Sequence, residues 1–254
     1  MVSVDQERLR LMAAAAAGDV EAMEQLGEYH LRRGQLALAE PWFRRAAERG
    51  DVDGMANLGM TLLERGEIAE AEGWLRRAVN AGNRPAGTTL GALLIQRGDY
   101  GEAEPLLRAS AAAGSVFALV NLSNLLDDTG RGGEARQMLH AAATGTGAPE
   151  ASLALGILLV RDGDAAGAEP WLRMAADTGD VDALAYLGGA LLQTGRVREA
   201  ERVLRSAGDA GHPYAVHALA ALLVQRGRRR DRAEAERLLR QLAETGGAED
   251  RRGG

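Results

Sequence analysis

The pattern of apolar and polar positions repeats every 32 or 33 residues along nearly the whole chain. Seven glycines mark the repeat, and each is followed by a leucine eight residues later and by a second glycine after 16 residues. These marker glycines are Gly18, Gly50, Gly82, Gly114, Gly147, Gly179 and Gly211. Within each half of a repeat, small and apolar residues recur three and four positions apart. This spacing predicts two amphipathic helices per repeat, here called helix A and helix B.

Residues that begin and end helices stand between these segments. The expected N-caps of helix A follow the marker glycines, and they are Asp19, Asp51, Asn83, Ser115 and Asp180. Their side chains can accept hydrogen bonds from the free amides of the first turn. The marker glycine suits the left-handed position that ends the preceding helix. Pro41, Pro105 and Pro170 are expected near the start of helix B, where a missing amide costs little.

These elements predict an all-α solenoid in a single domain over residues 1–247. A lone helix B over residues 3–17 is expected to cap seven helix-turn-helix units of about 32 residues. The units start near residues 18, 50, 82, 114, 147, 179 and 211, and residues 248–254 are expected to be a disordered tail. The fourth unit carries Gly132, Gly133 and an extra residue near Gly145, so we expect it to be the weakest part of the array.

The repeat resembles a known family. Leu58-Gly59, Ala71, Leu75 and Ala78 look like the tetratricopeptide repeat, and the segments 71–78 and 168–176 are similar to its Sel1-like subfamily. The unit is shorter than the usual 34 residues of this family. The resemblance implies a right-handed superhelix whose concave side is lined by helix A and binds peptides or partner proteins.

Composition narrows the possible chemistry. The net charge is −6, and Cys is absent, which excludes disulfides and thiolate nucleophiles. All 30 Lys and Arg positions are Arg, which excludes phosphate sites and Schiff bases that depend on lysine. The four His form no metal-binding motif, so the chain is expected to have no catalytic residue, cofactor or metal, and not to be an enzyme. No apolar stretch has the length of a membrane helix, and the N-terminus resembles no signal peptide, so we expect a cytoplasmic protein that does not contact membranes.

Most arginines are explained by a solvent-exposed helix face. Glu→Arg pairs four residues apart predict a solvated outer face of helix B, and they are Glu40–Arg44, Glu72–Arg76, Glu104–Arg108, Glu169–Arg173, Glu201–Arg205 and Glu236–Arg240. Residues 226–232 are Arg-rich and are expected to form a loop between helices. An alternative function is therefore a regulatory module that binds nucleic acid or an acidic partner through such segments, although the acidic balance makes nucleic acid a poor fit.

The predicted function is a non-enzymatic scaffold that binds a protein or peptide along the groove. The candidate partner-binding residues on the concave face are Glu21, Glu24, Glu28, Asp53, Asn57, Phe117, Val120, Asn121, Asn124, Leu153, Ile157, Tyr186 and Tyr214. The acidic members predict a segment, extended or helical, that is basic at one end, and the apolar members predict anchors for its other end. In the other interpretation, the aromatic rings pack within the superhelix. The sequence leaves the oligomeric state open.

Overall fold

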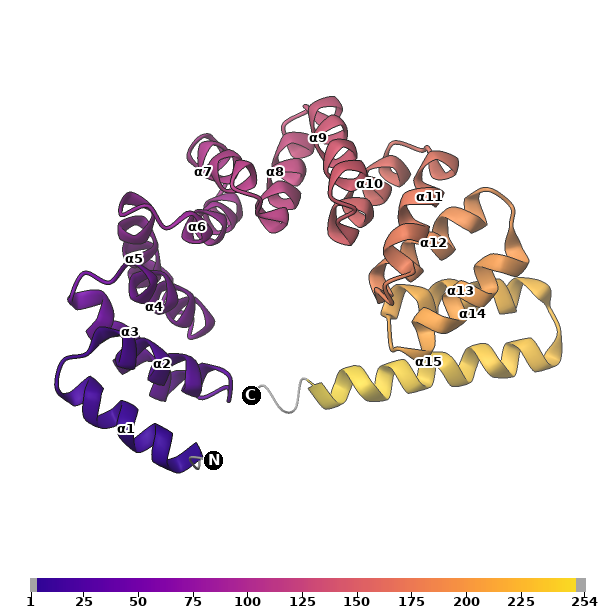
Figure 1. Ribbon diagram of the computed structural model, residues 1–254. Coiled ribbons are helices and arrows are strands. Elements are labelled where there is room, and N and C mark those ends of the chain that lie inside the picture. Colours follow the sequence, from indigo (N-terminus) through magenta and orange to yellow (C-terminus); the bar gives the residue numbers. More distant parts are fainter. Residues whose placement is uncertain (1–3, 250–254) are drawn as a thin grey trace. The chain divides into compact units, whose positions relative to one another are not determined.

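The computed structural model describes the backbone of residues 4–249 and the side chains of residue 6 and residues 8–244. This part of the chain forms fifteen helices and no strand, which confirms the predicted all-α solenoid (Figure 1). The helices are α1 (Val4–Ala16), α2 (Val20–Leu31), α3 (Leu36–Glu48), α4 (Val52–Glu64), α5 (Ile68–Asn80), α6 (Arg84–Arg97), α7 (Tyr100–Ala112), α8 (Val116–Asp128), α9 (Gly132–Gly145), α10 (Pro149–Arg161), α11 (Ala165–Ala176), α12 (Val181–Gln193), α13 (Val197–Asp209), α14 (Pro213–Arg226) and α15 (Arg229–Glu249).

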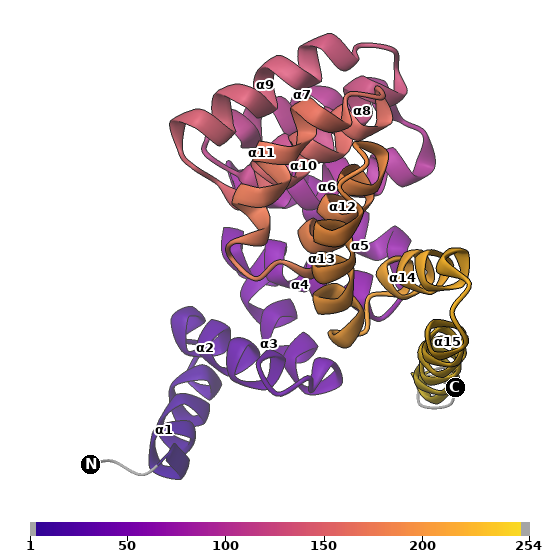
Figure 2. The ribbon, with the colours of Figure 1, turned by 90° about the vertical axis from the view of Figure 1, so that its right-hand side faces the viewer.

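The chain divides into two compact units, Met1–Leu125 and Leu126–Gly254, and α8 crosses the boundary between them. In the first unit α2, α4 and α6 are helix A elements, and each packs against the helix B that follows it. In the second unit α10, α12 and α14 do the same, and Figure 2 shows α15 beside α14 at the end of the stack. The number of repeat units and the single domain over residues 1–247 stay predictions.

The ends of the helices follow the predicted chemistry. All seven marker glycines and all seven second glycines have φ between +65° and +100°, a region that side chains with a Cβ rarely adopt. The predicted N-caps accept hydrogen bonds from amides three residues ahead, as the Asp180 carboxylate does from Ala183 N at 2.7 Å. The capping helix predicted over residues 3–17 corresponds to α1, and most of the predicted disordered tail lies outside the described residues. Helix α15 continues to Glu249, two residues past the predicted end of the domain.

Two local predictions were wrong. Pro41 in α3, Pro105 in α7 and Pro170 in α11 are each the sixth residue of the helix rather than part of its first turn. Pro41 therefore removes the hydrogen bond to the Ala37 carbonyl. Ala37 is exposed, and water can reach this carbonyl. The Arg-rich segment is not a loop, because α15 begins at Arg229. In α15, Leu238 packs against the core cluster that contains Ala235, whereas Leu239 is 38% exposed.

Glycines in helix A set the distance between the two helices of a repeat. A Cβ on Gly59 in α4 would lie 2.7 Å from Leu75 Cγ in α5, and one on Gly156 in α10 would lie 2.5 Å from Leu172 Cγ in α11. Both leucines are fully buried. The repeated pairing of Gly with Leu therefore builds the core by close approach of two backbones.

Candidate partner-binding surfaces

Three of the four acidic residues predicted on the concave face come together in the first unit. Glu24 and Glu28 lie on α2, and Asp53 lies on α4. Burial raises the pKa of Glu24 from 4.5 to about 7, helped by a hydrogen bond with Asp51 and by the charges of Asp51, Asp53 and Glu28. This cluster therefore changes its charge near neutral pH.

The other polar candidates on α2 and α4 lie outside this cluster. Glu21 lies apart, in a cleft between α1 and α2, where Gln25 Nε2 donates to it at 3.2 Å. Asp53 accepts a hydrogen bond of 2.8 Å from Asn83 Nδ2, which links α4 to α6. Asn57 is half-buried on α4. Only three of the four predicted acidic residues therefore share one surface.

The Phe117 ring, in the first unit, is largely exposed to solvent. It lies near the start of α8 and is 70% exposed. The ring lines a cleft of about 510 Å³ together with Met60 from α4 and with Thr88 and Thr89 from α6. Further along α8, Val120 and Asn121 are half-buried and Asn124 is exposed. Met60 was missed, although it stands ten residues after its marker glycine, as the predicted residue Ile157 does.

Four predicted residues meet in a second cleft, within the second unit. Leu153 and Ile157 from α10, Tyr186 from α12 and Tyr214 from α14 line a space of about 470 Å³. The two tyrosine rings stack with their centroids 6.5 Å apart and their planes at 23°. Tyr186 is 38% exposed and Tyr214 is 51% exposed. The rings touch each other and still present much of their surface to solvent.

The rim of this second cleft contains residues that were not predicted. His212 Nε2 lies 3.0 Å from Asp182 Oδ1, and Gln193 completes the polar edge. A Cβ on Gly189 would lie 2.7 Å from the Tyr214 hydroxyl, so this glycine makes room for the ring. Asp182 and Gly189 stand three and ten residues after their marker glycine, as the predicted residues Glu21 and Glu28 do, so the spacing could have identified both. Their residue types alone gave no signal.

The described residues hold no group of three or more His, Asp and Glu side chains arranged to bind a metal ion. No helix in that same part of the chain combines the length and the apolar character needed to span a bilayer.

Family comparisons decide what kind of repeat this is. Three family models, each described as tetratricopeptide repeat, match residues 8–54 and 120–182, residues 53–84, and residues 85–109 and 175–206. Together they cover well over half of the chain. The chain belongs to the tetratricopeptide repeat family. The Sel1-like subtype stays a prediction, and no curated protein sequence matches the chain.

Solved structures share the tetratricopeptide fold at low sequence identity. PilF from Pseudomonas aeruginosa is 20% identical with a TM-score of 0.61, and the match covers 74% of this chain and 88% of PilF. A tetratricopeptide repeat protein from Parabacteroides merdae is 16% identical with a TM-score of 0.62, covering 94% and 91%. Yeast Tom70 is 15% identical with a TM-score of 0.68, covering 94% of this chain and 56% of Tom70. Tetratricopeptide repeats generally serve as non-enzymatic scaffolds for protein–protein interaction.

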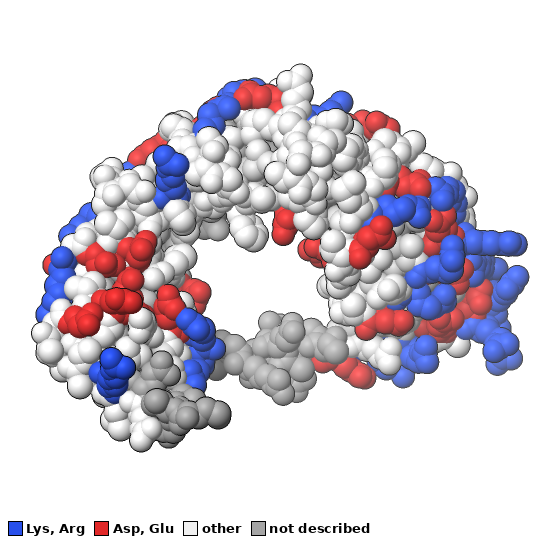
Figure 3. Space-filling view, in the orientation of Figure 1, with Lys and Arg blue, Asp and Glu red and all other residues white. Residues whose placement is uncertain are grey.

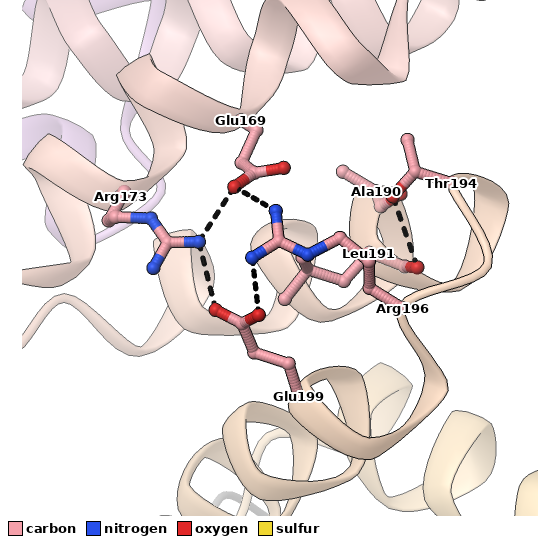
Figure 4. A network of polar contacts seen from close by, with 7 residues as sticks. All are labelled: Glu169, Arg173, Ala190, Leu191, Thr194, Arg196 and Glu199. Carbon is pink, nitrogen blue, oxygen red and sulfur yellow. Dashed lines mark hydrogen bonds and ion pairs between the residues drawn. The ribbon is translucent and has the colours of Figure 1, made fainter.

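The outer face of the helix B elements carries more ion pairs than the sequence predicted. Five of the predicted Glu→Arg pairs form, and Glu236–Arg240 stays a prediction. Four of these pairs also contact the next repeat, which forms a Glu–Arg ladder within each unit; they are Glu40–Arg44, Glu72–Arg76, Glu169–Arg173 and Glu201–Arg205. In Figure 4, Glu169 contacts Arg173 at 2.7 Å and also pairs with Arg196, while Glu199 contacts Arg173 at 2.9 Å and pairs with Arg196. These guanidinium groups lower the pKa of Glu169 and of Glu199.

The ladder also bears on the alternative function. Figure 3 shows acidic and basic side chains intermixed over the second unit rather than gathered into one basic patch. In the Arg-rich segment, Arg226 pairs with Glu201, whereas Arg228, Arg229 and Arg230 are exposed. Arginines that are already paired with carboxylates contribute little to binding phosphate.

Proposed function

We propose that this tetratricopeptide repeat protein is a non-enzymatic scaffold that binds a segment of a partner protein on its helix A surface. The observation that carries the proposal is the cleft of the second unit. Leu153 and Ile157 give it an apolar floor, and Tyr186 and Tyr214 leave large ring surfaces open to solvent. Exposed aromatic rings beside an apolar hollow favour an interaction site, because covering them removes apolar surface from water.

The chemistry of the partner follows from both units. The second cleft fits an apolar side chain of an extended or helical segment. In the first unit, the cluster of Glu24, Glu28 and Asp53 favours a basic segment, since opposite charge steers association and fixes orientation. The remaining candidates are also proposed to contact the partner, and they are Asn57, Val120, Asn121 and Asn124.

The test compares two tyrosines of equal exposure. Binding segments are first selected from a displayed library of natural protein fragments, and their affinities are then measured by calorimetry. Tyr186 on helix A and Tyr100 on helix B are both 38% exposed, so Tyr100→Ala is a matched control for Tyr186→Ala. Loss of a buried aromatic anchor costs about 2 kcal/mol, which is about thirtyfold in affinity. Tyr100→Ala should change the affinity less than twofold.

Equal affinities for both variants and for the wild type would refute the helix A surface as the binding face. Selection of acidic segments that depend on Arg228–Arg230 would instead support the alternative, binding of an acidic partner or nucleic acid. The cytoplasmic location stays a prediction from the sequence.

A further inference from the structure

Arg84 departs from the repeat at the position where helix A begins. In each of the other six repeats, the residue two positions after the marker glycine is valine or proline, and these residues are Val20, Val52, Val116, Pro149, Val181 and Pro213. Arg84 is exposed, and it forms no ion pair with any carboxylate in the described part of the chain. Packing within the repeat therefore gives no reason for an arginine at this position.

The electrostatics of the helix also disfavour a cation at this position. The amino end of a helix carries a partial positive charge, so a carboxylate in the first turn is favourable and an arginine is unfavourable. The other arginines of the helix A elements are each the last residue of their helix and pair with carboxylates, and they are Arg97, Arg161 and Arg226. Arg84 becomes favourable only when an anion lies beside it.

The carboxylates that other repeats carry one position later are missing around Arg84. Three residues after the marker glycine, four repeats carry an acidic residue, and these are Glu21, Asp53, Glu150 and Asp182. The third and fourth repeats carry Pro85 and Phe117 instead. Both line the first-unit cleft of about 510 Å³, together with Arg84 and Met60. Arg84 is the one charged residue among the described residues of this lining, so the cleft is apolar with a basic edge.

Hydroxyl contacts fix the backbone around the cleft without engaging the arginine side chain. Ser110 Oγ at the end of α7 donates to the Arg84 carbonyl oxygen at 2.8 Å. Ser115 Oγ lies 3.2 Å from Thr88 Oγ1 and accepts from Ala118 N at 3.2 Å. The starts of α6 and α8 are thereby held to their neighbours, whereas the Arg84 side chain is exposed.

We propose that this first-unit cleft binds an apolar segment of a partner protein that carries an acidic side chain within the segment. Phe117 and Met60 are both exposed and contact the apolar residues of the segment, because covering them removes apolar surface from water. The glutamate or aspartate lies against the Arg84 guanidinium, near the amino ends of α6 and α8. Opposite charge thus fixes the orientation of the segment.

This site is separate from both surfaces that carry the proposed function. Its lining comes from α4, α6, the start of α8 and the end of α7, all within the first unit. The second-unit cleft shares no residue with it. The cluster of Glu24, Glu28 and Asp53 favours a basic segment, whereas Arg84 favours an acidic one.

The experiment uses short peptides with blocked ends as probes. Each heptapeptide is acetylated and amidated, carries a glutamate at its centre flanked by leucine, phenylalanine or methionine, and ends in serine on both sides. Each is paired with a peptide in which glutamine replaces the glutamate, so that the two differ only in charge. Binding of every peptide to the full chain is measured by calorimetry.

Two arginine variants of the protein are matched. Arg84→Val restores the residue type of the other repeats, and Arg77→Val removes the same charge from an exposed position of α5. We expect the wild type and Arg77→Val to prefer the glutamate peptide at least threefold, and Arg84→Val to bind both peptides equally. Phe117→Ala should weaken binding of the glutamate peptide at least tenfold. Tyr186→Ala should leave it unchanged, which separates this site from the proposed function.

Several outcomes would overturn the proposal. They are absence of saturable binding by every glutamate peptide, equal binding of the glutamate and glutamine peptides by the wild type, a preference for glutamate that persists in Arg84→Val, and unchanged binding by Phe117→Ala. A glutamine peptide with a free C-terminal carboxylate should bind no better than its blocked form, and tighter binding would show recognition of a chain end instead. A dimer of the free chain that Phe117→Ala dissociates would also overturn the proposal, because a second copy would then cover the cleft.

Discussion

A single methyl group tests whether close approach of helix A and helix B holds each repeat together. Gly59→Ala adds a Cβ that would lie 2.7 Å from Leu75 Cγ, 2.8 Å from Leu75 Cδ2 and 3.3 Å from the Ala71 carbonyl oxygen. Real Cβ atoms do not approach other heavy atoms to less than 3 Å, and Leu75 is fully buried. The helices must therefore separate, or Leu75 must leave its preferred rotamer.

The magnitude follows from two opposing terms. Overpacking in a well-packed core costs about 1–3 kcal/mol. Replacing glycine by alanine inside a helix contributes about 1 kcal/mol in the stabilising direction. We expect a net loss of about 1 kcal/mol in the free energy of unfolding for Gly59→Ala. A larger loss of about 3 kcal/mol is expected for Gly59→Leu, whose longer side chain meets the same wall.

The matched control lies in the next helix of the same repeat. Gly73 is exposed in the interior of α5, and a Cβ there would meet no atom within 4 Å. Gly73→Ala should therefore stabilise the protein by up to about 1 kcal/mol. Urea denaturation followed by circular dichroism compares the variants, and each kcal/mol should move the thermal midpoint by about 2–4 °C.

Two results would refute the reasoning. One is a shift of the same sign for Gly59→Ala and Gly73→Ala. The other concerns Leu75→Ala, which removes the atoms that the new methyl group meets. In that background, Gly59→Ala should no longer destabilise, so strict additivity of the two changes would show that they do not share a contact.

Two further predictions concern α9 and the acidic cluster. Helix α9 has glycines in its first turn, and it carries Arg136 and His140 where other repeats carry the Glu→Arg pair. Its amides should therefore exchange hydrogen faster than those of α11. Equal protection of the two helices would contradict this prediction. Because Glu24 has a pKa of about 7 when folded and 4.5 ordinarily, the folded state binds its proton more tightly, and its contribution to stability is lost as pH rises from about 4.5 to 7. Glu24→Gln should remove this decline and, after allowance for solvent screening, stabilise the protein by about 1 kcal/mol at pH 8, as measured by urea midpoints at pH 5 and 8.

The sequence was sufficient to predict the fold because every repeat restates the same physical solution. Glycines with positive φ, capping side chains and the Gly–Leu contact each recur at a fixed spacing, so an error at one copy would not change the interpretation. One prediction failed where a single copy departs from the pattern, and another failed at a position that the pattern does not fix. The Arg-rich insertion before Ala235 is part of α15 rather than a loop, and the position of Pro41 within α3 could not be placed from spacing alone.

The ladder shows a different limit of sequence reasoning. Spacing four residues apart predicts a pair on one helix, but it carries no information on which side chains meet across two repeats. Arg173 belongs to such a pair with Glu169, and it also reaches Glu199 26 residues later. Each exposed ion pair contributes at most about 1 kcal/mol, so the contacts between repeats are a small correction to a stability that resides in the buried Gly–Leu contacts.

Gly189 departs from the repeat pattern, and packing of the core does not explain why a glycine stands there. Gly189 stands where other helix A elements carry Glu28, Met60 or Ile157, and it faces the Tyr214 hydroxyl rather than a buried leucine. A glycine inside a helix costs about 1 kcal/mol relative to alanine. Here it adds no contact between helix A and helix B, and its effect is on the space beside two exposed tyrosine rings. In an array where regular glycines serve the core, an extra glycine that serves only the shape of a cleft supports the proposal that this cleft is used.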